Sequence, residues 1–240
     1  MGAQWKHAGR IENSSKRGAL ISKLVKEILV AAKGGDPNPD NNARLRAAVE
    51  SARKASVPRE NIERAIKKGA GLLDGQIQYD LITYEGFAPH KIPVVVECLT
   101  DNKNRAAADI RVLFRKGMLG AMGSVSWMFD RLGVVEATIA DQGKDIETIA
   151  IEAGAQNVEP LESYEVPEAS IGARFFCDPT DLDGVSKYLV QSGWILTLSE
   201  MSYIAKNPLD LPEDQKKEIS EFLNAIDEND DVHRVYAALK

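Results

Sequence analysis

The sequence predicts a multi-domain α+β protein: an N-terminal three-helix domain is followed by two α/β (ferredoxin-like) domains, the third inserted into the second. Apolar residues recur at helical spacing through the first 72 residues, and from residue 80 short period-two runs alternate with helices. A helix and a strand close the chain without a sheet of their own, and a strand is not expected to stand alone. The predicted domains are residues 1–79, residues 80–135 with 203–240, and residues 136–202.

Three helices are predicted in the N-terminal domain, after an irregular start over residues 1–15. The first helix ends at Gly34, and Asn41 or Asn42 caps the second. The third starts near Pro58, because proline is favoured at the first helical position. The apolar positions expected to form the core of this domain are Leu20, Leu24, Ile28, Leu45, Val49, Ile62 and Ile66.

The second domain follows a linker over residues 72–80 and is predicted in the order β, β, α, β, β. Asn104 is expected to cap its helix, which runs over residues 105–116 and leads into a glycine-rich turn. The strands are predicted at residues 82–87, 92–99, 124–129 and 134–137.

The inserted domain is predicted as a second α+β set, with Thr180 as the cap of its second helix. Its helices are predicted at residues 146–153 and 182–192, and its strands at 157–161, 162–166, 173–177 and 195–201. The chain then closes with a helix that starts at Glu213 and a strand at residues 232–239. We expect this last strand to join the sheet of the second domain.

Charge is distributed unevenly along the chain. Residues 1–72 hold 15 Lys and Arg against 7 Asp and Glu, a net charge of +8, whereas the other 168 residues hold 15 against 29, a net charge of −14. Such an asymmetry indicates that one end contacts a nucleic acid or another anionic surface. The alternative is a solvated helical surface that happens to be rich in Lys and Arg.

The bulk composition argues against a membrane protein and an exported one. No run approaches the roughly 18 apolar residues of a membrane span, and the polar, basic start lacks the apolar segment of a secretory signal. A cytoplasmic protein without a membrane partner is therefore expected. Cys98 and Cys177 lie in apolar stretches, which predicts two buried free thiols.

The sequence contains none of the common catalytic or metal-binding motifs. His7, His90 and His233 lie far apart and have no neighbours at zinc-ligand spacing. Neither a nucleophile elbow nor a phosphate-binding glycine loop is present. The sequence therefore predicts no enzyme, no catalytic residue, no metal site, no cofactor and no small-molecule substrate.

The basic N-terminal domain holds the candidate nucleic-acid-binding residues. They are Lys6, Arg10, Lys16, Arg17, Lys23, Lys26, Arg44, Arg46, Arg53 and Lys54, and further basic residues follow at Arg59, Arg64, Lys67 and Lys68. Contacts of this kind to phosphates supply affinity but no sequence information. Trp5 stands among them and either stacks on a base or packs into the helical domain.

A second candidate surface lies where a predicted strand leads into a helix. Its residues are Asp101, Asn102, Asn104, Arg105 and Arg111. Asn and Asp at such a place ordinarily turn the chain and cap the helix. The alternative is a surface for a partner, formed with the arginines of the following helix.

Several segments carry a family resemblance. They are KLVKEI at 23–28, AAKGGDP at 31–37, VPRENIERAIKKG at 57–69, YEGF at 84–87, VECLTDNKNR at 96–105, GSVSWMFD at 123–130 and DDVHRVY at 230–236. In this order they resemble the YebC/PmpR family, whose organellar relative is a translational activator of a cytochrome oxidase subunit. The family usually opens Gly-His-Ser-Lys-Trp, whereas this chain opens Gly2-Ala3-Gln4-Trp5.

The resemblance implies a helical domain and two α/β domains, without enzymatic activity or a cofactor. It also implies a cytoplasmic DNA-binding transcriptional regulator. A ribosome-associated, RNA-binding translation factor is the alternative, because charge alone does not separate duplex DNA from ribosomal RNA. A protein-binding adaptor that uses the acidic surface and residues 101–115 is a further alternative.

Overall fold

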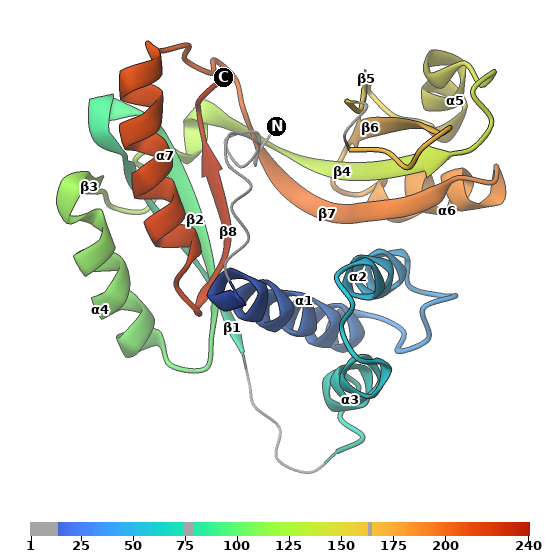
Figure 1. Cartoon of the computed structure of the whole chain (residues 1–240), viewed down its shortest axis with the longest axis horizontal. Helices are drawn as coiled ribbons and strands as arrows, with labels where there is room; N and C mark the ends of the chain where they lie inside the picture. Colours follow the sequence, from blue (N-terminus) through green and yellow to red (C-terminus); the bar gives the residue numbers. More distant parts are fainter. Residues whose placement is uncertain (1–13, 74–78, 163–164) are drawn as a thin grey trace. The chain divides into compact units, whose positions relative to one another are not determined.

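The computed structural model describes residues 14–73, 79–162 and 165–240, apart from the side chains of residues 14–17 and 19 (Figure 1). It confirms a mixed α+β fold that divides into two compact units. Unit 1 takes its described residues from the ranges 1–23, 77–130 and 203–240, and unit 2 from 24–76 and 131–202. Unit 2 thus groups most of the helical region with the inserted segment, and the division into three domains stays a prediction.

The N-terminal region forms the three predicted helices, α1 (Ser14–Gly34), α2 (Ala43–Lys54) and α3 (Arg59–Gly69). Asn42 is the cap of α2, because its Oδ1 accepts the backbone N–H of Leu45 at 3.0 Å. The end of α3 packs directly on α1: a Cβ on Gly69 would lie 2.3 Å from the carbonyl oxygen of Leu29. Only glycine permits so close an approach of two helix backbones.

The core of this helical region is slightly smaller than predicted. Ile28, Leu45 and Ile62 are buried, as expected. Leu20 is half exposed, which corrects its assignment to the core.

Unit 1 contains a sheet of β1 (Asp80–Phe87), β2 (Pro93–Thr100), β3 (Met118–Leu119) and β8 (Val232–Ala237) in the order β3-β1-β2-β8. Adjacent strands are antiparallel. The C-terminal strand β8 pairs with β2, as predicted. Helices α4 (Lys103–Leu113) and α7 (Glu213–Asp227) cover one face, where their apolar residues share a core with alternate residues of β2. All eight residues of β2 are buried, because Val125 and Phe129 cover the other face.

Unit 2 contains the second sheet, which is built from β4 (Phe129–Ile139), β5 (Asn157–Pro160), β6 (Ile171–Cys177) and β7 (Ile195–Ala205) in the order β5-β6-β4-β7. Helices α5 (Ile146–Ala153) and α6 (Leu182–Gln191) follow β4 and β6 in the chain. The succession β-α-β-β-α-β with this strand order is ferredoxin-like, which confirms the predicted class. Apolar residues of α2 join the core of this unit.

The structure corrects the predicted strand at residues 124–129. This segment contains a short 3-10 turn, η4 (Ser126–Met128). Strand β4 then runs without a break through residues 130–133, which separate the two predicted strands. The cause is Glu85 of β1, whose carboxylate accepts the backbone N–H groups of Gly123, Val125 and Ser126, each at 2.8 Å. Donors that bind a carboxylate are not available to a strand ladder.

Three smaller predictions are also corrected. Asn102, not Asn104, caps α4, because its Oδ1 accepts the N–H of Arg105 at 3.1 Å. Asp181, not Thr180, occupies the cap position of α6. The described residues within 162–166 form no strand.

Both cysteines are buried free thiols, as predicted, and burial raises the pKa of Cys177 to about 11. No helix among the described residues has both the length and the apolar character needed to cross a membrane. The same residues contain no group of three or more His, Cys, Asp or Glu arranged to hold a metal ion.

Candidate nucleic-acid interface

The predicted basic residues nearest the N-terminus cannot be placed. Lys6 and Arg10 lie outside the described residues, as does Trp5. The backbone of Lys16 and Arg17 belongs to α1, but their side chains also lie outside the described part. The candidates with described side chains therefore begin at Lys23.

Lys23 of α1 is engaged within the protein. Its Nζ lies 2.8 Å from Oδ1 of Asp227 and also donates to the backbone carbonyl of that residue, at the end of α7. A lysine in this position neutralises a carboxylate and satisfies a helix-terminal carbonyl. Because only 12% of its side chain is exposed, its amine presents little charge to a ligand.

Arg44 of α2 is engaged in the same way. Its Nε lies 2.7 Å and its Nη2 3.3 Å from the two carboxylate oxygens of Glu27, whose side chain is 8% exposed. This two-pronged contact fixes α2 against α1. Arg44 is therefore placed to stabilise the helical region.

The remaining candidates with described side chains are partly or fully exposed. Arg46 donates to the carbonyl oxygen of Asp40 at 2.6 Å, and Arg53 pairs with Glu50 at 2.7 Å while keeping 66% of its side chain exposed. Lys54 is exposed, and Lys26 is partly exposed. Surface pairs of this type are weak and exchange readily for a phosphate.

A basic face on α3 was not among the ten candidates. Only Ile62 and Ala65 of this helix are buried. Arg64, Lys67 and Lys68 occupy positions away from that buried pair and, within the described chain, have no ion-pair partner. Arg59 bonds Glu63 at 2.6 Å, and this bond, together with the charge of Lys67, lowers the pKa of Glu63. Helical spacing relative to Ile62 was the signal that could have identified this face.

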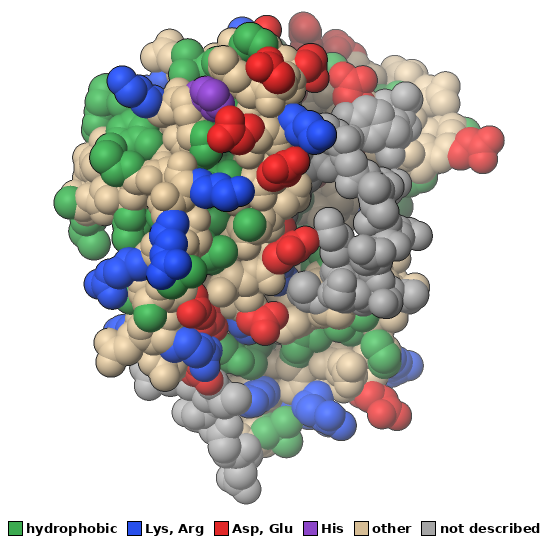
Figure 2. All heavy atoms as spheres, turned by 60° about the vertical axis from the view of Figure 1, so that its left-hand side comes forward, with side chains coloured by type: hydrophobic (Ala, Val, Ile, Leu, Met, Phe, Trp, Pro, Cys, Tyr) green, Lys and Arg blue, Asp and Glu red, His purple; other side chains and the backbone are tan. Residues whose placement is uncertain are grey.

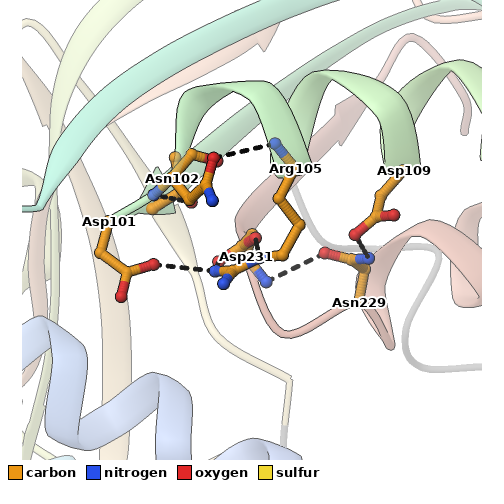
Figure 3. Close-up of polar contacts among 7 residues, drawn as sticks. Asp101, Asn102, Arg105, Asp109, Asn229 and Asp231 are labelled. Carbon is orange, nitrogen blue, oxygen red and sulfur yellow. Dashed lines mark hydrogen bonds and ion pairs between the residues drawn. The ribbon is translucent and has the colours of Figure 1, made fainter.

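Three residues of the second candidate surface, Asp101, Asn102 and Arg105, make polar contacts within the protein (Figure 3). Arg105 donates to both carboxylate oxygens of Asp231, at 2.9 and 3.0 Å, and to Asp101 at 2.8 Å. These bonds raise the pKa of Arg105 and tie the start of α4 to the turn before β8. Asn102 caps the helix. Three of the five residues therefore make contacts within the fold, and one of them, Asn102, acts as a helix cap.

Asn104 and Arg111 are different. Both side chains are exposed, and neither has a hydrogen-bond or ion-pair partner in the part of the chain that the structure describes. Arg111 lies on α4, well beyond the Arg105 contacts at the start of that helix. A role in partner binding stays a prediction for these two residues.

Comparison with known proteins agrees with the resemblance in the sequence. The profile of the TACO1/YebC protein N-terminal domain matches residues 3–72, and that of the TACO1/YebC second and third domain matches residues 79–239. A relative from Pseudomonas syringae pv. tomato is 50% identical, with 100% of this chain and 99% of the relative covered. One from Bdellovibrio bacteriovorus is 47% identical, with 100% of both covered. Both are named probable transcriptional regulatory proteins.

A solved structure is similar over nearly the whole chain. The conserved hypothetical protein Aq1575 from Aquifex aeolicus superposes with a TM-score of 0.79 at 39% identity, covering 99% of this chain and 96% of that one. The profiles and the full-length relatives agree with this likeness in fold. The chain therefore belongs to the TACO1/YebC family.

Proposed function

We propose that this chain is a cytoplasmic, non-enzymatic DNA-binding regulator of transcription. The observation that carries the proposal is a set of four cations that have no ion-pair partner among the described residues. Arg64 and Lys67 of α3 and Lys54 at the end of α2 are exposed, and Lys68 of α3 is partly exposed. The names of the full-length relatives support a regulatory role. Cations without carboxylate partners gain most from a phosphate, because no internal ion pair has to break first.

The contact surface that follows differs from the set predicted by charge alone. Lys23 and Arg44 hold carboxylates of the protein and are not counted as phosphate contacts. Lys54, Arg64, Lys67 and Lys68 form the set that we propose instead. Contacts from these cations to phosphates would position the duplex and supply affinity, and phosphate contacts carry no sequence information.

Salt-dependent binding tests this proposal. The affinity of the full chain for a duplex DNA oligonucleotide is measured by fluorescence anisotropy between about 50 and 200 mM salt. In the triple variant Arg64→Glu, Lys67→Glu, Lys68→Glu, the slope of log K against log salt should fall by about 2.7, at about 0.9 for each lost phosphate contact. The matched control changes Lys144, Lys217 and Lys240, three exposed lysines outside the helical region, to Glu.

The outcomes test the position of the interface and distinguish DNA from RNA as the target. An unchanged slope in the α3 variant, or an equal drop in the control, would overturn the assignment of the interface. Folded RNA of equal length serves as the second arm, since charge does not distinguish the two polymers. Tighter binding to RNA, together with sedimentation of the protein with ribosomes at low salt, would replace DNA by ribosomal RNA as the target.

A further inference from the structure

A hollow of about 350 Å³ opens at the end of the unit 1 sheet. Phe87, Pro89 and Met118 give it apolar walls, and Lys91 and Lys116 stand at its sides. It lies where the turn between β1 and β2, called η2 (Pro89–Lys91), meets the start of β3. Its volume is at the lower end of the range for small-ligand sites.

The turn beside the hollow is held in a costly conformation. His90 and Lys91 are consecutive non-glycine residues with φ of 60° and 61°. Each left-handed residue of this kind costs roughly 1–2 kcal/mol and persists only where its surroundings impose it. Here the N–H of Ala88 donates to the carbonyl of Ile92 at 2.8 Å, and His90 Nε2 lies 2.8 Å from Glu218 of α7. The turn therefore keeps Lys91 at the rim.

Four cations at or near this hollow have no ion-pair partner in the described residues. Lys91 and Lys116 flank it, Arg115 lies beside Lys116 in the 3-10 turn η3 (Phe114–Lys116), and Arg111 lies near the end of α4. On the face drawn in Figure 2, Lys and Arg side chains lie beside exposed hydrophobic ones, with Asp and Glu side chains among them. Glu218 of α7 is engaged by His90, whose Nε2 lies 2.8 Å from its carboxylate.

We infer that this surface binds a single-stranded segment of nucleic acid, with one unpaired base in the hollow and the backbone phosphates along Lys91, Lys116, Arg115 and Arg111. An apolar cavity edged by cations matches the flat base and charged backbone of a nucleotide. A base inside a duplex cannot enter, because its faces are stacked. The inference rests on the proposed nucleic-acid binding and extends it to the unit that carries the acidic α7.

The test compares single strands with the duplex on the full-length protein. RNA and DNA single strands of about 12 nucleotides, each with one 2-aminopurine, are titrated beside a duplex of the same sequence. Wild type should bind the single strands and quench the 2-aminopurine by stacking. Lys91→Glu with Lys116→Glu should weaken single-strand binding about tenfold or more and lower the salt slope by about 1.4, at about 0.7 per contact.

Matched variants control for charge and for folding. Lys144→Glu with Lys217→Glu changes the net charge equally and should leave single-strand affinity within about twofold. Met118→Asp should abolish the quenching, whereas Met122→Asp, at a side chain 90% exposed in the same region, should not. Both methionines are exposed enough that neither change is expected to unfold the sheet.

Each outcome decides one point. Equal binding by the Lys91/Lys116 variant and its control, or quenching that survives Met118→Asp, would overturn the inference while leaving the α3 interface intact. Absence of any nucleic-acid binding by the wild type would instead remove the proposed function. A poly-glutamate peptide that binds as tightly as the single strands would show that the surface takes acidic chains rather than nucleotides.

Discussion

Unit 1 and unit 2 each contain a four-stranded sheet, but the charged group with the most polar contacts differs between them. In unit 1 the central groups are carboxylates. Glu85 accepts three backbone N–H groups, and Asp231 accepts two bonds from Arg105. Each carboxylate therefore holds an irregular segment of chain against the sheet.

In unit 2 the central group is a guanidinium. Arg174 of β6 pairs across the strands with Glu136 of β4 and Glu159 of β5. It lies 2.6 Å from Glu136, 3.9 Å from Glu159 and 3.7 Å from Glu165, and only 11% of its side chain is exposed. This cation joins strands that are already regular, so it adds to a ladder rather than shaping a loop. Unit 1 should consequently depend more strongly on its ionic groups.

Truncation of Glu85 should have the largest effect on stability. Glu85→Ala leaves three backbone donors without their acceptor, one of them fully buried, and should lower the free energy of unfolding by about 3 kcal/mol or more. Urea denaturation followed by circular dichroism measures this loss. Glu85→Gln keeps one acceptor oxygen and should lose less. A loss below about 1 kcal/mol for the alanine variant would show that the loop does not depend on the carboxylate.

Removal of the central cation of unit 2 should rank second. Arg174→Met preserves much of the side-chain volume but leaves three carboxylates close together, and should cost about 2 to 3 kcal/mol. The matched control is Lys187→Met, which breaks an exposed pair with Asp183 and should cost about 0.5 kcal/mol or less. Equal losses in the two variants would contradict the cross-strand role of Arg174.

Asp231→Asn should have a smaller effect than either. It weakens the contact with Arg105, whose side chain is half exposed, so water compensates part of the loss. We expect about 1 to 2 kcal/mol. Asp101 contacts the same arginine from an exposed position. Asp101→Asn should therefore change the free energy of unfolding by less than about 0.5 kcal/mol. If Asp101→Asn proved the more damaging, Asp231 would not be the principal partner.

These contacts mark the limit of what the sequence could predict. Helices α1, α2, α3 and α7 were predictable because each buries a face whose apolar residues recur at helical spacing. The segment 124–129 was not. Its residues suit a strand, but its N–H groups are taken by Glu85, 40 residues earlier in the chain. Local pattern carries no information about such a long-range acceptor.

The candidate interface shows the same division. Charge along the chain correctly indicated a basic helical region, but it could not show which cations are already neutralised. Lys23 meets Asp227, 204 residues away in sequence, and Arg44 meets Glu27 on another helix. The exposed face of α3 follows from residue spacing within a single helix, so it could have been predicted from the sequence. Pairing between distant elements is what required the structure.

Protonation of Glu85 at low pH should lower the stability of the protein, by less than truncation of its side chain does. Burial raises the pKa of Glu85, but the bonds from the backbone N–H groups of Gly123, Val125 and Ser126 outweigh burial and hold it below its ordinary 4.5. A depressed folded-state pKa means that the stabilisation is complete above the unfolded value and is lost as the pH falls through the folded one.

The wild type should therefore lose stability more steeply than Glu85→Gln as the pH falls below 4.5, and the two curves should run parallel at higher pH. The difference should be smaller than the effect of truncation, because a protonated carboxyl keeps its acceptor oxygens in place. Urea midpoints taken across this pH range measure it. Because the remaining carboxylates titrate in both proteins, only the difference between the two curves reports on Glu85. Parallel curves throughout would mean that the loop gains nothing from the charge and is held by the geometry of the acceptor alone.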